Sequence, residues 1–269
     1  MSAMANASLP PAFLTLLAHG VRWQLLSALA RSDYRVQDLA GLVDKPMNLV
    51  SYHLRRLREA KLVRERHSDA DSRDVYYSMD LDRMRQLYRD AGEALHPALG
   101  RSEAFAADKA GPGEQPRARV LFLCTENSAR SQMAEGILRH LGRGSVDVYS
   151  TGTRPTEVHP LAVRAMAEIG VDISQHRSKS LDEFLGQSFD YIITVCDRIK
   201  EACPTFPGDP ERIHWSFADP AAAEGTEQTR YWAFKLTSSE LLTMIRFLLI
   251  TIERDRREAD KFRYGGVRS

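Results

Sequence analysis

One stretch near the middle of the chain constrains the fold more than any other. The apolar run Val120–Leu123 leads into the polar loop Cys124–Arg130, and a helical pattern begins at Ser131. A strand, a tight polar loop and a helix form the repeating unit of a parallel sheet flanked by helices. In such a unit the loop lies at the carboxyl edge of the sheet, where main-chain N–H groups and the helix dipole favour an anion. We therefore expect an α/β domain with an oxyanion site at Cys124.

The composition of the chain changes once along its length. A chain of 269 residues is long enough for about two domains, and its 43% apolar content suffices for packed cores. Residues 97–117 are rich in glycine and proline and lack apolar periodicity, which predicts a flexible linker. We expect a first domain over residues 1–96, a second over residues 118–258 and a tail over residues 259–269.

The first half combines helical apolar spacing with one expected hairpin. We expect helices at residues 12–19, 21–30, 36–42, 47–60 and 81–95, and hairpin strands at residues 62–67 and 74–79. A helix, a turn, a second helix and a two-stranded hairpin form the plan of a winged helix-turn-helix, an α+β fold that binds DNA.

Local charge favours a contact with DNA, although the net charge of the whole chain is only +1. Residues 55–66 hold six basic side chains and two acidic ones, which suits a phosphate backbone. In a winged helix the second helix enters the major groove and the hairpin contacts phosphates. The residues expected to face DNA are Asn48, Ser51, Tyr52, His53, Arg55, Arg56, Arg66 and Arg73. The alternative is a basic helix that only faces solvent.

The second half alternates strands and helices, as a parallel sheet requires. We expect strands at residues 119–123, 146–150, 191–195 and 213–216, and helices at residues 131–141, 159–169, 181–184 and 231–254. This order predicts a three-layer α/β domain in which a four-stranded parallel sheet lies between helices.

The loop carries the residues that a thiol nucleophile needs. The helix dipole, main-chain N–H groups and the Arg130 guanidinium should lower the pKa of Cys124. The planar fork of Arg130 can also hold two oxygens of a tetrahedral anion. We expect Asn127 to fix the loop by side-chain hydrogen bonds and Ser131 to donate its hydroxyl to the thiolate. The expected oxyanion-binding residues are Thr125, Glu126, Asn127, Ser128, Ala129 and Ser131. The alternative is an ordinary buried cysteine at position 124.

Three further residues complete a candidate mechanism. Asp219 is the candidate general acid for a leaving group, although an Asp-Pro pair is often only a turn. Cys196 and Cys203 lie seven residues apart, and they can bond if the intervening segment rearranges. Together with a nucleophilic third thiol they indicate a redox relay. The alternative is two inert buried thiols.

The first half resembles the ArsR-type family of metalloregulators over residues 15–95. The resemblance rests on the stretches Val36–Ala40, Val50–Leu54 and Leu57–Val63. It implies a dimer formed through the first and last helices and bound to palindromic operator DNA. Many members carry a Cys-x-Cys pair where this chain has Arg35 and Gln37. Residues 1–123 contain no cysteine, so this half lacks the thiolates that would bind arsenite.

The second half resembles the thioredoxin-coupled arsenate reductases, which share the low-molecular-weight tyrosine phosphatase fold. The resemblance covers residues 118–256. It rests on the motifs Cys124–Glu135, Tyr149–Thr153, Asp172–Asp182, Cys196 with Cys203–Pro204, and His214–Ala221. A tyrosine phosphatase would usually have an aromatic residue after the Asp-Pro pair and would lack the two relay thiols. This chain has Ala221 and both thiols, which favours the reductase.

The resemblance implies a mechanism. Cys124 attacks arsenate, Asp219 protonates the departing water, and Cys196 attacks Cys124 to release arsenite. Cys203 then attacks Cys196, and thioredoxin reduces the resulting disulfide. Glu126 stands where many members have glycine, and its carboxylate should weaken anion binding. No bound cofactor is expected.

A metal is not expected either. Some members of the reductase family bind potassium near the loop, through residues that match Asn127, Glu135 and Ser150 here. The fourth ligand, a carboxylate in those members, matches Lys179. Because the Lys179 ammonium can replace the cation, we expect no metal requirement.

Three functions remain open at this point. The first is a bifunctional protein that reduces arsenate and binds operator DNA. The second is a repressor whose reductase-like domain senses arsenic or oxidation, and the third is a tyrosine phosphatase fused to a DNA-binding domain. Any arsenite response would have to act through the three cysteines. Their small number, the lack of an export signal and the lack of an apolar run of about 20 residues point to a cytoplasmic protein with no membrane contact.

Overall fold

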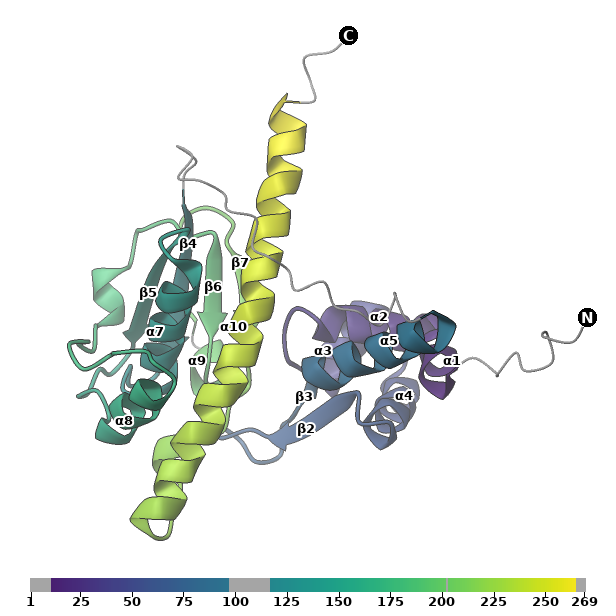
Figure 1. Ribbon diagram of the computed structural model, residues 1–269, viewed down its shortest axis with the longest axis horizontal. Coiled ribbons are helices and arrows are strands. Elements are labelled where there is room, and N and C mark those ends of the chain that lie inside the picture. The colour runs from purple at the N-terminus through teal and green to yellow at the C-terminus, as the bar shows by residue number, and fades with distance from the viewer. Residues whose placement is uncertain (1–10, 97–116, 202, 265–269) are drawn as a thin grey trace, which may run out of the picture. The chain divides into compact units, whose positions relative to one another are not determined.

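The computed structural model describes residues 11–96, 117–201 and 203–264 (Figure 1). The chain divides into two compact units, residues 1–67 with 73–115 and residues 68–72 with 116–269. The linker expected at residues 97–117 lies outside the described residues, apart from residue 117. None of the described helices is long and apolar enough to cross a membrane.

The first unit is a winged helix-turn-helix, as the sequence predicted. Its helices are α1 Ala12–Leu17, α2 Gly20–Leu29, α3 Val36–Val43, α4 Met47–Glu59 and α5 Leu81–Leu95. Its strands are β1 Tyr34–Arg35, β2 Val63–His67 and β3 Val75–Met79, which form an antiparallel sheet in the order β1-β3-β2. The predicted hairpin is confirmed. Strand β1 was not predicted, because two residues are too few to show a period.

The turn between α3 and α4 follows from local backbone chemistry. Asp44 ends α3 in the left-handed conformation with φ 49°, and Pro46 precedes the first residue of α4. Proline suits a helix start because its φ is already helical and it has no N–H to leave unpaired. Helix α4 then buries Val50, Leu54 and Leu57 in the core of the unit. The helix therefore presents its basic face to solvent.

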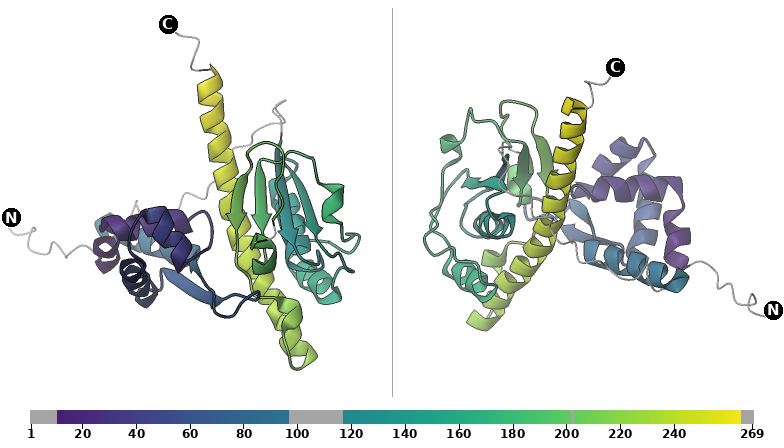
Figure 2. Two further views of the ribbon diagram at one scale, coloured as in Figure 1. Left: turned by 180° about the vertical axis from the view of Figure 1, so that it is seen from behind. Right: turned by 45° about the horizontal axis from the view of Figure 1, so that its top comes forward.

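The second unit is the predicted three-layer α/β domain. Its strands are β4 Ala118–Cys124, β5 Val146–Gly152, β6 Tyr191–Thr194 and β7 Glu211–His214, all parallel, in the order β5-β4-β6-β7. Its helices are α7 Arg130–Gly142, α8 Pro160–Glu168, α9 Asp197–Glu201 and α10 Glu227–Tyr264, with the 3-10 helices η1 Leu181–Glu183 and η2 Pro220–Ala222. Helix α10 packs along α7 and α8 (Figure 1), and the view from behind shows the four strands in front of α10 (Figure 2).

Burial explains why β4 is continuously apolar. Val120, Leu121, Phe122 and Leu123 are all fully buried, although successive side chains of a strand point to opposite faces. Both faces of the sheet are therefore covered at β4, as is typical of parallel sheets. The strand ends at Cys124, which places this residue at the carboxyl edge where ligands bind in such folds.

Helix α9 was not predicted, and β7 lies two residues earlier than the strand expected at residues 213–216. Two further elements also differ from the prediction. The helix expected at residues 181–184 is a single 3-10 turn, whose N-cap Ser180 accepts a hydrogen bond from the Asp182 N–H. The helix expected at residues 231–254 begins at Glu227 and continues to Tyr264, into the expected tail. Its earlier start has a local cause, because the Thr226 hydroxyl accepts a hydrogen bond from the N–H of Thr229 at 3.2 Å.

Candidate active site

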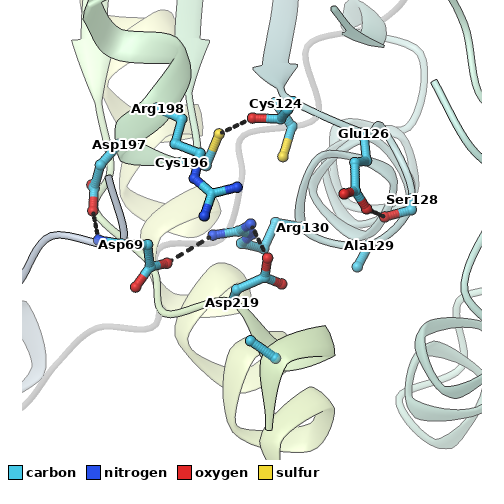
Figure 3. Close-up of a pocket in the computed structure, with 12 residues that line it drawn as sticks. Asp69, Cys124, Glu126, Ser128, Ala129, Arg130, Cys196, Asp197, Arg198 and Asp219 are labelled. Atoms are coloured by element: carbon cyan, nitrogen blue, oxygen red, sulfur yellow. Dashed lines mark hydrogen bonds and ion pairs between the residues drawn. The ribbon is translucent and has the colours of Figure 1, made fainter. Parts of the chain in front are cut away.

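A cavity of about 260 Å³ lies at the carboxyl end of β4. The loop after β4, the start of α9 and the segment before η2 all bring side chains to it. The residues that line it include Cys124, Thr125, Glu126, Ser128, Ala129, Arg130, Cys196, Asp197, Arg198 and Asp219 (Figure 3). The structure thus brings together four of the five predicted catalytic residues, which come from distant parts of the sequence.

Asn127 holds the loop from behind. It is fully buried with φ 50°, a left-handed conformation that asparagine tolerates better than most residues. Its Nδ2 donates to the hydroxyls of Ser131 at 2.9 Å and Ser150 at 2.8 Å. Its Oδ1 accepts from Gln132 Nε2 at 2.9 Å and from the Lys179 N–H at 2.8 Å. These bonds fix the loop conformation without using the groups that face the cavity.

Close packing under the loop requires glycine at position 152, the last residue of β5. A Cβ there would lie 2.7 Å from the main-chain oxygen of Thr125 and 2.8 Å from the main-chain nitrogen of Asn127. Both contacts are with backbone, which cannot move aside without deforming the loop. In the sequence Gly152 stands out only as part of the motif Tyr149–Thr153, and its neighbours in the chain do not indicate this role.

Arg130, the first residue of α7, directs its guanidinium into the cavity (Figure 3). Its Nη1 donates to the main-chain oxygen of Phe217 at 3.0 Å, and its Nη2 lies 2.9 Å from Asp219 Oδ2. Burial opposes its charge, but the neighbouring Cys124 and Asp219 outweigh burial and keep the pKa of Arg130 above its usual value. The cation is therefore permanent and held in a fixed orientation.

Cys124 and Cys196 both line the cavity and their thiols interact, so they ionise as a pair. The Cys124 thiol stabilises the thiolate of Cys196 and lowers the pKa of Cys196 to about 6, with further help from Arg130 and from the Thr125 hydroxyl, 3.4 Å from the sulfur. The neighbouring Cys196, together with burial, raises the pKa of Cys124. The sequence predicted a lowered pKa for Cys124. In this pocket the lowered pKa belongs to Cys196, because two adjacent thiolates repel each other.

Cys203, the third thiol, is half-buried and follows α9. Burial raises its pKa, although the Arg212 guanidinium, with Nη1 3.6 Å from the sulfur, acts in the opposite direction. It does not line the cavity, so the structure places two of the three thiols at the cavity and the third outside it.

Ser131 differs from the expectation. It is fully buried and accepts the hydrogen bond from Asn127, and no contact joins its hydroxyl to Cys124 among the described residues. As the second residue of α7 it points beneath the loop, not into the cavity. The hydroxyl that contacts a sulfur is that of Thr125, a contact with Cys196 that sequence spacing alone does not reveal.

Lys179 lies behind the loop and is mostly buried. Its Nζ is 3.0 Å from Glu135 Oε2 and 3.2 Å from the main-chain oxygen of Arg177. Glu135 also accepts a hydrogen bond from Ser150 at 2.5 Å. Burial opposes the ionisation of Glu135, but Lys179 and Ser150 outweigh burial and lower its pKa. The ammonium, the carboxylate and the Ser150 hydroxyl form a continuous network that reaches Asn127.

The first unit exposes most of the residues expected to face DNA. Asn48, Ser51, Tyr52 and Arg55 line a surface hollow together with Arg58 and Tyr77. Arg56 and Arg73 are also exposed, and Arg66 is half-buried.

His53 was wrongly placed on the DNA-facing side. Its side chain is only 3% exposed, and its ring lies 4.5 Å from that of His19. Position 53 is three residues after the buried Val50 and four before the buried Leu57, so it shares their face of α4. Its Nδ1 has no hydrogen-bond partner among the described residues.

The fold and the site together define a class of protein: an α/β domain in which a cysteine, an arginine and a main-chain loop surround one cavity at the carboxyl edge of the sheet. The chain belongs to the low molecular weight phosphotyrosine protein phosphatase family, whose model matches residues 119–257. Residues 19–65 match the model of the bacterial regulatory proteins of the arsR family. Both resemblances found in the sequence are confirmed.

Individual relatives of the second unit are arsenate reductases. One from Halalkalibacterium halodurans is 44% identical over 122 residues, which are 45% of this chain and 88% of that protein. One from Bacillus licheniformis is 47% identical over 116 residues, which are 43% of this chain and 82% of that protein. Among solved structures, an arsenate reductase in the oxidized state is 29% identical with a TM-score of 0.45, covering 50% of this chain and 98% of that one. The chain thus joins an ArsR-type DNA-binding domain to an arsenate reductase-type domain.

Proposed function

We propose that the second unit reduces arsenate to arsenite through a cysteine relay and that the first unit binds operator DNA. The observation that supports the enzymatic part is that Cys124 and Cys196 both line a cavity that also holds Arg130. A structural cysteine pair would not need a permanent cation beside it, whereas a nucleophile that attacks an oxyanion does.

The first step forms a bond between sulfur and arsenic. The proton of Cys124 passes to the neighbouring Cys196 thiolate, and the Cys124 thiolate attacks the arsenic atom. One arsenate oxygen leaves as water, with the proton delivered by Asp219. Arg130 and the main-chain N–H groups of the loop stabilise the remaining oxygens. The product is a Cys124–arsenic(V) adduct.

The relay then transfers two electrons to arsenic. Cys196 first releases the proton it accepted to solvent. Its thiolate then attacks the sulfur of Cys124 to form a disulfide, and the electron pair of the broken sulfur–arsenic bond stays on arsenic. Arsenic leaves as arsenite, in the +3 state. Cys203 next attacks Cys196, Cys124 departs as a thiolate, and a Cys196–Cys203 disulfide remains. Thioredoxin, a dithiol protein, reduces that bond by exchange.

The DNA-binding part of the proposal is supported by the exposed face of α4. Asn48, Ser51, Tyr52 and Arg55 share this face, at the position of a recognition helix. Winged helices read operator half-sites as dimers, with centres about one turn of DNA apart. We therefore propose a homodimer on a palindromic operator, assembled through the first unit.

Arsenate turnover in the presence of thioredoxin, thioredoxin reductase and NADPH tests the enzymatic proposal. The wild-type protein should oxidise NADPH with arsenate, and Cys196→Ser and Cys203→Ser should abolish this turnover. Wild-type protein that forms no arsenite would overturn it. If arsenite or oxidation still released operator DNA from that protein, the second unit would be a sensor.

A phosphatase is the second candidate, because the family model and the cysteine loop are shared with phosphotyrosine phosphatases. Hydrolysis of an aryl phosphate that survives the loss of both Cys196 and Cys203 would identify this activity. The two relay thiols, which a phosphatase does not need, favour the reductase.

A further inference from the structure

The cavity contains two arginines in contrasting environments. Arg130 is 7% exposed and already engaged by Phe217 and Asp219. Arg198, the second residue of α9, is exposed and lines the same cavity. Among the described residues it forms no ion pair and no side-chain hydrogen bond. The cation that is accessible from solvent is therefore Arg198.

The direction of the Arg198 side chain is clear in Figure 3. Its guanidinium lies beside that of Arg130 and below Cys196, within the cavity. Glu126 lies on the other side of Cys124, and its carboxylate is exposed. An anion that approaches Cys124 therefore passes between a free guanidinium and a carboxylate.

The charges around the cavity make this arginine necessary. Four acidic residues, Asp69, Glu126, Asp197 and Asp219, line the cavity, against the two cations Arg130 and Arg198. Without Arg198 a single guanidinium would be set against four acidic residues. An arsenate or phosphate anion would then be repelled at the entrance before it reached the loop.

We propose that Arg198 is a substrate-binding residue that captures the oxyanion and holds the oxygens that point away from the loop. Arg130 and the loop amides bind one side of the anion, and Arg198 binds the opposite side. A planar guanidinium suits this task because it can donate to two oxygens at once. The inference rests on the oxyanion site of the proposed function, but not on turnover.

The same residue separates substrate from product. Arsenate is an anion at neutral pH, whereas arsenite is the uncharged acid As(OH)₃. Arg198 attracts the arsenate anion, whereas arsenite carries no net charge for Arg198 to attract. Its contribution should therefore appear in the KM for arsenate and in phosphate affinity, and not in the rate of arsenite release.

Protection of Cys124 from iodoacetamide measures binding without turnover. The labelled peptide is quantified by mass spectrometry over a series of inorganic phosphate concentrations, for wild type, Arg198→Gln and Arg198→Lys. We expect about tenfold weaker protection in Arg198→Gln, the effect of one lost charge-assisted contact. Arg198→Lys should retain most of the protection because it keeps the charge. Arg164→Gln, an exposed arginine of α8 that does not line the cavity, is the matched control.

Steady-state kinetics supply the second measurement. Arg198→Gln should raise the KM for arsenate by about tenfold with a nearly unchanged kcat, and the difference from wild type should shrink at high salt. Equal phosphate protection in wild type and Arg198→Gln would overturn the role of Arg198 and leave the reductase intact. Wild-type Cys124 that phosphate does not protect at all would overturn the oxyanion site, and the role of Arg198 with it.

Discussion

The guanidinium of Arg130 lies 2.9 Å from the carboxylate of Asp219, inside the cavity that contains Cys124. An oxyanion that binds the same fork must share or replace this contact, because the other terminal nitrogen already donates to Phe217. In the proposed mechanism, substrate recognition by Arg130 and placement of the acid Asp219 are therefore linked through one contact.

Replacing Asp219 with asparagine separates these two roles. Asparagine keeps the shape of the side chain but cannot deliver a proton, so kcat for arsenate should fall by about 100-fold or more. Phosphate affinity should not fall, because the variant loses a carboxylate that competes for Arg130. Initial rates with thioredoxin and phosphate protection of Cys124 measure the two quantities. A variant that changes only KM would show that Asp219 is not the acid.

The pKa of Cys196, about 6, predicts the pH dependence of its reactivity. A thiol below its pKa is protonated and unreactive, so labelling of Cys196 by iodoacetamide should rise as the pH increases through about 6. Cys124→Ala removes the neighbouring thiol that stabilises the Cys196 thiolate, so the midpoint should move upward. Peptide mass spectrometry resolves Cys196 from the other two thiols. A wild-type midpoint near 9.0, the ordinary value for cysteine, would show that Cys124 does not stabilise the Cys196 thiolate.

The sequence was informative where local chemistry decides the structure. The apolar run at β4, the loop from Cys124 to Arg130 and the turn at Pro46 each follow from residues close together in the chain. Contacts that depend on tertiary packing were missed. Thr125 meets Cys196 across 71 positions, and Gly152 is needed only because the loop lies directly over it.

His53 shows a different kind of error. The signal was present in the sequence, since position 53 falls on the apolar face of α4 between Val50 and Leu57. The basic residues around it suggested DNA, and the residue type was given more weight than the helical period. Ser131 was misplaced for a related reason, because a residue early in a helix can point beneath a loop as readily as towards it.

Glu126 offers a test of the charge at the entrance of the cavity. Its exposed carboxylate should repel arsenate, so Glu126→Gln should lower the KM for arsenate by about twofold to threefold at low salt, a small effect because solvent screens exposed charges. The kcat value should stay the same, since the residue does not touch the reacting atoms. Kinetics at two salt concentrations check both statements. A higher KM in the variant would show that Glu126 assists binding.

Substitutions in α4 test whether its exposed face binds operator DNA. Arg55→Gln should weaken operator binding and reduce the slope of log affinity against log salt by about one, the effect of one lost phosphate contact. His53→Gln should instead lower the stability of the first unit, because the side chain is buried. Fluorescence anisotropy with labelled operator DNA measures the first effect and thermal unfolding the second. Arg164→Gln in α8 is the control, and an equal loss in that variant would argue against α4 as the DNA-binding helix.

The position of Lys179 predicts how arsenate turnover responds to potassium. Its ammonium lies 3.0 Å from the buried Glu135, so wild-type activity should be the same in sodium and potassium buffers. In Lys179→Met the Glu135 carboxylate keeps its ion pair with Arg139, 2.6 Å away, but loses the buried ammonium of Lys179. We expect a loss of about 2 kcal/mol in the free energy of unfolding, less than for a fully unpaired buried charge.

Potassium should restore part of the activity of this variant, because a bound cation can take the place of the ammonium. Urea unfolding and arsenate turnover in the two buffers measure these effects. The double variant Lys179→Met with Glu135→Gln is the control, because it also removes the carboxylate that needs a partner. Strong potassium activation of the wild type would show that the ammonium does not replace a metal.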